Sequence, residues 1–363
     1  MNLAGKTVLM MAGGTGGHVY PALAVAQAAR EAGAEVHWLG NAQGFEGRKV
    51  PAYGFAFHDI AVRGLRGNGL AGWLQAPLML TRAIRAARRV IKSIRPDVVI
   101  GMGGFAAGPG GVAAKMAGVP LVIHEQNAVA GLTNRLLARV ADVVLLADGR
   151  AAARLGGKGE VTGNPVRAAF ADVPEPAVRY GARQGRIRLL VLGGSQGAKA
   201  LNALVPQALA RLPEDARPEV LHQAGERGLQ EAQSAYAECG VAAEVVPFME
   251  DMASAYADAD WVIARSGALT VAEIATVGLP ALFVPFPHAV DDHQTANAQT
   301  LVDAGAAQVV QQADLTAERL AGIIAAHGDR AALLARAEAA RRVSHDEALA
   351  RIMDAVGNVI FKK

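Results

Sequence analysis

An apolar run ends in a glycine-rich turn between Leu189 and Asn202, where the sequence reads LLVLGGSQGAKALN. The run predicts a buried strand, and the Ala/Leu pattern after Gly197 predicts a helix. Glycine accepts positive φ and carries no side chain, so backbone N–H groups at a helix N-terminus can face an anion there. This strand, turn and helix therefore predict a binding site for a phosphate group.

The same pattern occurs twice more in the first half of the chain. Residues 8–12 run into MAGGTGGH at 11–18, and residues 98–101 run into GMGGF at 101–105. Three glycine turns after three apolar strands favour ligands that carry phosphate.

Strand and helix patterns alternate along the chain, which is typical of parallel sheets with right-handed crossovers. In the first half we expect strands at 7–12, 35–39, 56–60, 97–101, 120–123 and 142–146, and helices at about 18–32, 73–94, 107–117 and 131–139. In the second half we expect strands at 186–192, 218–222, 243–247, 260–263, 280–284 and 307–310, with helices that begin near 198, 227, 251, 268, 292 and 316.

The chain is longer than one hydrophobic core usually serves, because it has 363 residues. Its periodic pattern weakens between 163 and 185, where prolines gather, so we place the domain boundary there. We expect an N-terminal domain at 1–166 and a C-terminal domain at 167–344. A helix at about 345–363, preceded by a capping box from Ser344 to Glu347, should pack back on the first domain. The fold class is α/β, with two Rossmann-like doubly wound domains facing a cleft.

Composition narrows the class of protein. Hydrophobic residues make up 52% and charged residues 19%, which indicates a well-packed chain and argues against disorder. The single Cys239 excludes a disulfide within the chain and points to a reducing compartment. The first apolar run is interpreted as a strand and not as a signal peptide, and no stretch approaches a membrane span. We therefore expect a cytoplasmic location.

The net charge of +3 is small and the basic residues are spread out, which weighs against nucleic acid as a partner. A local exception is the basic segment 82–95, which follows the apolar segment 73–80. Such a helix can lie on an anionic membrane surface, or it can be an ordinary amphipathic helix. Composition alone favours the ordinary helix.

Two common phosphate motifs do not fit. A dinucleotide fingerprint needs glycine where this chain has Val19, and no acidic residue closes the next strand. A P-loop needs Gly-Lys-Ser/Thr, but Ala198 precedes Lys199 and Ala200 follows it. A nicotinamide cofactor and ATP hydrolysis are both disfavoured.

Two further polar features suggest a nucleotide sugar. The segment 264–287 predicts a strand, a turn and a helix that carries Glu273, whose carboxylate could hold two ribose hydroxyls. A solvated helix glutamate is the default alternative. The polar loop at 288–299, which contains Gln294, either hydrogen-bonds sugar hydroxyls or caps a helix.

Several longer motifs together resemble one family. They are GGTGGHVYPALA at 13–24, IGMGGFAAGPGGVAA at 100–114, IHEQNAVAGLTNRLLA at 123–138, VTGNPVR at 161–167, the turn at 189–202, and ARSGALTVAEIA at 264–275. In this order, over nearly the whole chain, they resemble the MurG family of bacterial N-acetylglucosaminyltransferases.

The resemblance implies a GT-B fold and an inverting, metal-independent transfer without a cofactor. N-acetylglucosamine (GlcNAc) would pass from UDP-GlcNAc to the C4 hydroxyl of N-acetylmuramic acid (MurNAc) in lipid I, which makes lipid II. By motif, the donor would be bound by Thr15, Gly16, Gly17, Asn127, Arg167, Ser195, Met249, Ala268, Leu269, Thr270, Val271, Ala272, Glu273 and Gln294.

The acceptor diphosphate is then expected at Gly14, Gly103 and Gly104. His18 opens a helix whose N-terminus favours a neutral imidazole, which suits a catalytic base. The alternative is a histidine that caps the turn and contacts substrate without taking a proton, and Glu125 and His124 are competing bases. A lipid-linked acceptor also makes the basic segment the expected membrane contact, through Trp73, Leu74 and Met79. The protein would be peripheral on the cytoplasmic face of the bacterial plasma membrane, near other cell-wall synthesis and division proteins.

Three rivals remain: another GT-B glycolipid glycosyltransferase, a UDP-GlcNAc 2-epimerase, and a non-catalytic nucleotide-sugar-binding scaffold subunit. The motif at 123–138 favours the MurG family over the other enzymes. The presence of His18, Arg167 and Glu273 argues against a scaffold.

Overall fold

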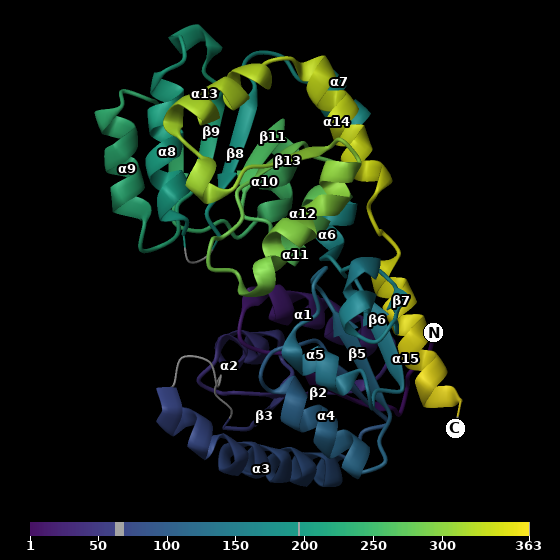
Figure 1. The fold of residues 1–363 in the computed structure, drawn as a ribbon. Helices are drawn as coiled ribbons and strands as arrows, with labels where there is room; N and C mark the ends of the chain where they lie inside the picture. The colour runs from purple at the N-terminus through teal and green to yellow at the C-terminus, as the bar shows by residue number, and fades with distance from the viewer. Residues whose placement is uncertain (62–68, 195–196, 363) are drawn as a thin grey trace. The chain divides into compact units, whose positions relative to one another are not determined.

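A computed structural model describes residues 1–61, 69–194 and 197–362 of the chain (Figure 1). It divides into two compact units, Met1–Arg167 with His345–Lys363, and Ala168–Ser344. The sequence placed this boundary between 166 and 167. Each unit is an α/β layer structure with its own parallel sheet, as the alternating pattern predicted.

The first unit is built on a parallel sheet in the order β3-β2-β1-β4-β5-β6-β7. Its strands are β1 (Thr7–Met11), β2 (Glu35–Gly40), β3 (Ala56–Asp59), β4 (Val98–Gly101), β5 (Leu121–Glu125), β6 (Val143–Leu146) and β7 (Glu160–Val161). The short edge strand β7 was not predicted, because two residues show no periodicity.

Both faces of the central part of this sheet are buried, so β1, β4 and β6 are nearly continuous apolar runs, whereas the edge strands β3 and β7 are partly or largely exposed. In β1, Val8 and Met10 pack in the cluster that includes α1 (Gly16–Glu31) and α15 (Ala348–Phe361). The alternate residues Leu9 and Met11 pack in the cluster on the other face. That face is covered by α3 (Gly69–Ile94), α4 (Ala107–Met116) and α5 (Leu132–Leu137), while α2 (Phe45–Lys49) follows β2.

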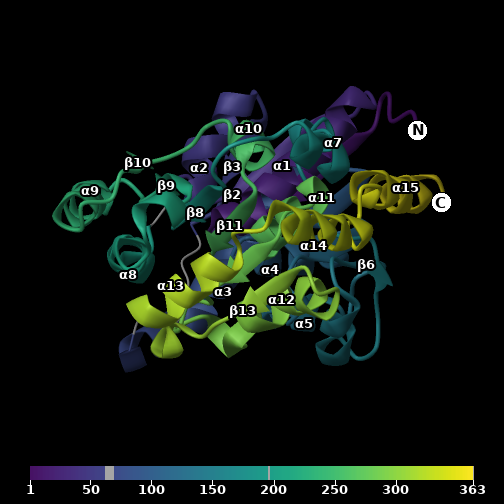
Figure 2. The same cartoon turned by 90° about the horizontal axis from the view of Figure 1, so that it is seen from above.

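The C-terminal helix α15 contacts α1 and places Ile352, Val356 and Ile360 in the core of the first unit. Both chain ends lie beside α15 (Figures 1 and 2). The capping box predicted for this helix is wrong. The helix begins at Ala348, and the Ser344 hydroxyl accepts a hydrogen bond from Arg341 instead.

The second unit repeats the plan with a parallel sheet in the order β10-β9-β8-β11-β12-β13. Its strands are β8 (Arg188–Leu192), β9 (Glu219–Gln223), β10 (Glu244–Val246), β11 (Trp261–Ala264), β12 (Ala281–Phe283) and β13 (Ala307–Val309). Helix α8 (Lys199–Ala210) contacts α9 (Leu229–Glu238) and α13 (Ala317–Ala326). Helix α11 (Ala268–Val277) contacts α10 (Met252–Asp258), α12 (His293–Asp303) and α14 (Arg330–Arg342).

The segment after the boundary is more ordered than the sequence predicted. It forms α6 (Ala168–Ala171) and α7 (Pro176–Gly181). Pro176 occupies the first turn of α7, where its missing N–H has no intrahelical partner to lose. The prolines therefore begin a helix here and do not mark a structureless linker.

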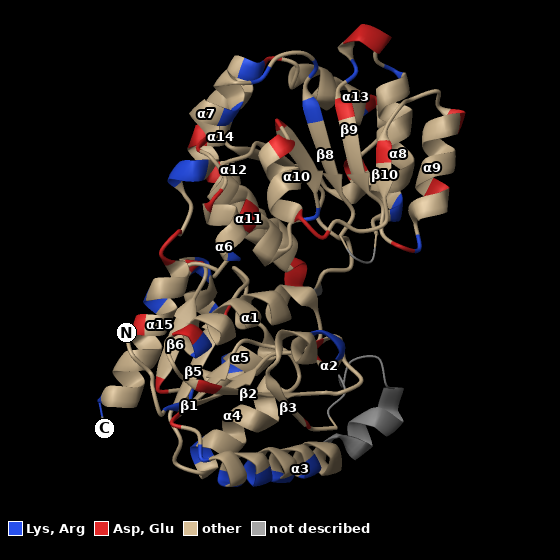
Figure 3. Ribbon diagram, turned by 180° about the vertical axis from the view of Figure 1, so that it is seen from behind, with Lys and Arg blue, Asp and Glu red and all other residues tan. Residues whose placement is uncertain are grey.

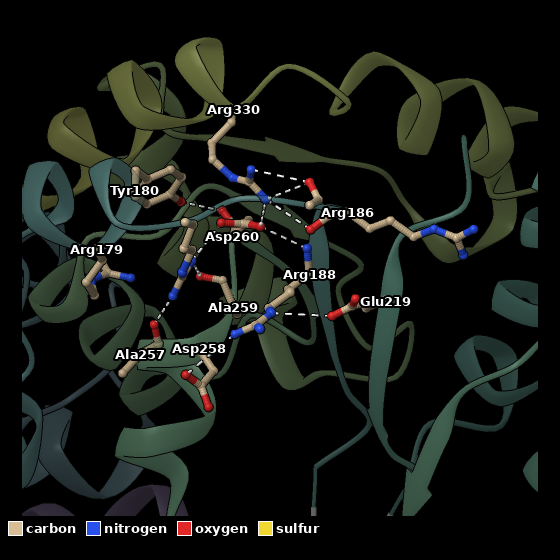
Figure 4. A network of polar contacts seen from close by, with 12 residues as sticks. Arg179, Tyr180, Arg186, Arg188, Glu219, Ala257, Asp258, Ala259, Asp260 and Arg330 are labelled. Carbon is tan, nitrogen blue, oxygen red and sulfur yellow. Dashed lines mark hydrogen bonds and ion pairs between the residues drawn. The ribbon is translucent and has the colours of Figure 1, made fainter. Parts of the chain in front are cut away.

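A buried polar network ties α7 and α14 to the amino-terminal edge of the second sheet (Figure 4). Asp260 is fully buried and accepts hydrogen bonds from the backbone N–H of Arg188 at 2.8 Å and from Arg183 Nη1 at 2.7 Å. The hydroxyl of Tyr180 donates to the Asp260 carbonyl oxygen. This network lies at the edge opposite the strand ends that carry the glycine turns.

Candidate functional site

Both sheets reverse their strand order between a pair of strands, at β1/β4 and at β8/β11. Ligands of open parallel sheets bind at the carboxyl ends of such pairs. In the first unit the two glycine turns pack on each other there. A Cβ on Gly104, which has φ +82°, would lie 2.2 Å from the Gly13 carbonyl oxygen. Glycine at 104 is therefore required by the contact between the turns.

Glu46, which sequence analysis missed, holds the first of these turns. Its side chain is 3% exposed, and its Oε2 accepts a hydrogen bond from the Gly14 N–H at 3.0 Å while Oε1 accepts from the Asn41 N–H at 3.0 Å. The Gly14 N–H is thus already used, which removes it from the donors expected for the acceptor diphosphate. No local motif marked this glutamate.

His18 lies in the first turn of α1 and is half-buried. Its ring packs against Gly103, where φ is +86° and a Cβ would lie 2.7 Å from His18 Nδ1. The same Nδ1 is 2.9 Å from Gln126 Oε1. The structure therefore brings together three of the predicted features: the first glycine turn, the second glycine turn and the histidine.

Gln126 joins His18 to a second histidine. Gln126 Nε2 lies 3.1 Å from His124 Nδ1 and 3.2 Å from the His124 carbonyl oxygen. His124 Nε2 is 3.0 Å from the Gly163 carbonyl oxygen. Burial lowers the pKa of His124 to about 4, although the Gly163 carbonyl and Glu125 act in the opposite direction. His124 is therefore neutral near pH 7.

Glu125 is 2% exposed and is fully engaged as an acceptor. Its Oε1 accepts from the backbone N–H and the side-chain amide of Asn127, at 3.0 and 3.2 Å. Its Oε2 accepts from the Gly131 N–H at 3.1 Å and from Asn134 Nδ2 at 2.9 Å. This carboxylate organises the loop after β5, and its geometry does not favour the predicted role of catalytic base.

The predicted donor residues fall into both units. Thr15, Gly16 and Gly17 form the start of α1, and Arg167 lies with its guanidinium 5.9 Å from the ring centroid of Tyr20 on the same helix. These residues and Asn127 belong to the first unit, with His18.

In the second unit the described glycines after β8 make close backbone contacts. Gly194 and Gly197 have φ near +75°, and the Gly193 N–H donates to the Gln223 carbonyl at 3.0 Å. A Cβ on Gly197 would lie 2.5 Å from the Ala224 carbonyl oxygen. Ser195, which was predicted to bind the donor, lies outside the described residues.

The buried side-chain amides of Asn202 and Gln223 form hydrogen bonds with backbone groups close to this turn. Asn202 on α8 donates to the Ala224 carbonyl at 3.1 Å, and its Oδ1 is 3.1 Å from His222 Nε2. Burial lowers the pKa of His222 to about 4. Met249, a predicted donor residue, is 8% exposed, and its N–H donates to Gln223 Oε1 at 3.0 Å.

The predicted segment 268–273 forms the first turns of α11, directly after the turn that follows β11. Glu273 is 7% exposed, so the solvated alternative is wrong. Gln294 Oε1 accepts from the Phe286 N–H at 2.8 Å and closes the polar loop before α12.

Arg265, at the carboxyl end of β11, was also missed. Its guanidinium donates to the Val284 and Pro285 carbonyls at 2.8 and 3.0 Å and to Gln312 Oε1 at 2.6 Å. Burial lowers the pKa of Arg265. The position of this residue directly before the Ser-Gly turn was the sequence signal that could have identified it.

Exposed apolar side chains occur on α3, α4 and α5 of the first unit. Leu78, Leu80, Met116, Leu132 and Leu136 are each about half exposed, at 48–60%. Lysines and arginines line α3 (Figure 3). Of the predicted membrane residues, Met79 is half-buried, and the side chains of Trp73 and Leu74 lie outside the described residues.

Within residues 1–61, 69–194 and 197–362, no group of three or more His, Cys, Asp or Glu side chains is placed to hold a metal ion. Among the described helices none is long and apolar enough to cross a membrane.

Comparisons with known proteins agree over nearly the whole chain. Residues 8–146 match the glycosyltransferase family 28 N-terminal domain, and residues 188–352 match the glycosyltransferase family 28 C-terminal domain. A protein of Dichelobacter nodosus is 62% identical over 98% of this chain and 99% of its own length. A protein of Alkalilimnicola ehrlichii is 58% identical over 86% of this chain and 87% of its own length.

Both relatives are named UDP-N-acetylglucosamine–N-acetylmuramyl-(pentapeptide) pyrophosphoryl-undecaprenol N-acetylglucosamine transferase. The crystal structure of MurG from Acinetobacter baumannii superimposes with a TM-score of 0.83 at 40% identity, covering 97% of this chain and 99% of that one. A putative UDP-N-acetylglucosamine 2-epimerase from Listeria monocytogenes superimposes with a TM-score of 0.70 at 15% identity, which indicates a shared fold alone.

Proposed function

Because the chain belongs to glycosyltransferase family 28, we propose that it transfers GlcNAc from UDP-GlcNAc to lipid I and so makes lipid II in peptidoglycan synthesis. The observation that carries this function is 62% identity, over 98% of the chain, to a relative named for this transfer. In support of this proposal, His18 lies at the carboxyl edge of the first sheet, and the side-chain amide of Gln126 contacts its ring.

His18 is the proposed base. Transfer to the C4 hydroxyl of MurNAc forms the bond from O4 to C1 of GlcNAc, and the bond from C1 to the diphosphate oxygen breaks on the opposite face. The proton of the C4 hydroxyl passes to His18 Nε2, because Nδ1 already contacts Gln126. General base catalysis of this kind contributes about 10²–10⁴ to the rate.

The second unit is proposed to bind the donor. The electron pair of the breaking bond stays on the UDP diphosphate, so charge grows there during the reaction. Backbone N–H groups at the start of α8 can stabilise that charge. Glu273, which is largely buried in the second turn of α11, suits the two hydroxyls of the ribose.

The acceptor diphosphate is proposed to bind at the start of α1. The first N–H groups of a helix have no intrahelical acceptor, and here they belong to Gly16 and Gly17. Gly103 and Gly104 shape this site by allowing the close approach of His18 and Gly13. Arg167 is a cation on the same unit, close to Tyr20 of α1. This proposal moves Gly16, Gly17 and Arg167 from the donor, where the resemblance put them, to the acceptor.

Peripheral binding to an anionic membrane through α3, α4 and α5 is proposed for the lipid-linked acceptor. Exposed leucines and a methionine supply apolar area, and the basic side chains of α3 supply attraction to acidic headgroups. The relevant leaflet is the cytoplasmic one, where UDP-GlcNAc is available. Contacts with other cell-wall synthesis and division proteins are a further proposal from the resemblance alone.

The test is release of UDP from UDP-GlcNAc with and without a lipid I analogue. We expect release only with the analogue, together with a disaccharide product. A 2-epimerase would change the sugar nucleotide without an acceptor, and a scaffold would bind UDP-GlcNAc without turnover; either result would refute the transferase.

A further inference from the structure

We infer that Gln126 is a positioning residue that fixes which nitrogen of His18 carries the proton. The inference rests on the proposed role of His18 as the base and adds a reason why its Nε2 is the basic atom. It depends on a line of hydrogen bonds from the Gly163 carbonyl to the His18 ring, through His124 and Gln126.

Two carbonyl oxygens, which can only accept hydrogen bonds, determine which ring nitrogen of each histidine carries the proton. The Gly163 oxygen is 3.0 Å from His124 Nε2, so that nitrogen carries the proton and donates. His124 is fully buried and its pKa is lowered to about 4, so the ring is neutral and its Nδ1 is a bare acceptor.

The orientation of the Gln126 amide is then fixed as well. Its Nε2 faces the His124 carbonyl oxygen at 3.2 Å and the bare His124 Nδ1 at 3.1 Å, and both need a donor. Its Oε1 must therefore face His18. An amide oxygen only accepts, so His18 Nδ1 carries a proton and donates across 2.9 Å. A neutral His18 then has its lone pair on Nε2.

Neighbouring side chains hold these hydrogen-bonded groups in place. Asn164 Nδ2 donates to the Gln126 carbonyl at 3.0 Å, and the Thr162 hydroxyl donates to the Gly163 carbonyl at 3.2 Å. Gln126 is 2% exposed, so water does not compete for its amide. Among the described residues, His18 Nε2 has no hydrogen-bond partner, which leaves it available to a substrate hydroxyl.

The central variant is Gln126→Leu, which keeps similar bulk but neither donates nor accepts. We expect kcat to fall about tenfold or more, because the bond that selects one tautomer is lost. The KM for UDP-GlcNAc should stay within twofold. The matched control is Gln27→Leu, which makes the same change farther along α1 and should leave kcat unaltered.

Nitrogen NMR of protein labelled in its histidines gives a direct readout. In the wild type, His18 should show a protonated Nδ1 and a bare Nε2, and this pattern should be lost in Gln126→Leu. Gln126→Glu keeps an oxygen facing His18 and should retain the protonated Nδ1. A His18→Gln variant assigns the signal.

A double-mutant cycle separates positioning from a general loss of structure. If Gln126 acts through His18, Gln126→Leu should reduce kcat no further once His18 is Gln. Additive losses, or a His18 tautomer that is the same in wild type and Gln126→Leu, would overturn the inference. Absence of acceptor-dependent UDP release from the wild type would instead refute the proposed function, so the two failures are distinguishable.

Discussion

Asp260 and Arg330 are 70 residues apart, yet Arg330 Nη2 donates to the fully buried Asp260 carboxylate at 3.2 Å. Arg183 donates to the other oxygen of the same carboxylate at 2.7 Å. Asp260 thereby joins α14, the start of β11 and the segment after α7 at one point (Figure 4). This one carboxylate therefore links three segments at the amino-terminal edge of the second sheet.

Replacing Asp260 with Ala should destabilise the second unit by about 3–5 kcal/mol, because it leaves two partly buried guanidinium groups without their carboxylate. Urea unfolding followed by circular dichroism measures the change. The matched control is Asp258→Ala, whose side chain is 76% exposed and 3.9 Å from Arg188, and which should cost less than about 1 kcal/mol. Equal effects of the two variants would contradict the assignment.

Stability should also fall on mild acidification. His124 and His222 have pKa values of about 4 in the folded protein, because burial disfavours the charged ring. In the unfolded chain these histidines bind protons below about pH 6.5. The free energy of unfolding therefore falls as the pH is lowered from about 6.5 toward 4. Each histidine contributes a loss of up to roughly 3 kcal/mol over that window.

Urea midpoints measured between pH 7.5 and 5 test this expectation. His222→Gln should be less stable than the wild type at pH 7.5, but it should lose less stability on acidification, because one titrating group is gone. A wild type and variant with the same pH dependence would show that His222 does not titrate in this way.

Glu46 should control the acceptor side of the reaction. Both of its oxygens accept backbone N–H groups, so Glu46→Gln replaces one acceptor with a donor and should release the first glycine turn. We expect kcat/KM for the lipid I analogue to fall about tenfold or more, with the KM for UDP-GlcNAc within twofold. Glu31→Gln, an exposed change at the end of α1, is the control. A loss confined to the donor KM would contradict the assignment.

The strands were largely predictable from sequence, because buried parallel strands are continuous apolar runs. β1 was expected at 7–12 and is Thr7–Met11, and β11 was expected at 260–263 and is Trp261–Ala264. The glycine turns were also recognisable, since few residues other than glycine accept φ near +75°.

The supporting side chains were not predictable in the same way. His18 and Gln126 are 108 residues apart, and no periodicity links them. Glu125 carries a carboxylate next to a histidine in a long motif, so it resembled a base. Only its four hydrogen bonds show that both oxygens are occupied.

Glu273 should determine affinity for the nucleotide. Glu273→Gln keeps the size of the side chain but replaces a charged acceptor by a weaker one, and it should weaken UDP binding about tenfold, as hydrogen bonds to charged groups contribute about 1.5–3 kcal/mol. Isothermal titration with UDP measures the change. Glu231→Gln, an exposed change on α9, should leave the affinity unaltered. Unchanged UDP binding by Glu273→Gln would place the ribose elsewhere.

Binding to lipid vesicles should depend on the exposed leucines of α3. Leu78 and Leu80 are 54% and 48% exposed, and inserting one leucine into an apolar phase is worth up to about 1.5–3 kcal/mol. Leu78→Ser combined with Leu80→Ser should therefore weaken sedimentation with anionic vesicles by on the order of 10²-fold, while turnover of a water-soluble acceptor analogue persists. Val178→Ser removes a more exposed apolar side chain, 63% exposed, from α7 in the second unit and should change nothing. Because the basic residues of α3 add electrostatic attraction, binding should also weaken with added salt and with neutral lipid. If the double variant bound like the wild type, or if Val178→Ser had the larger effect, the membrane surface would have to lie on other residues.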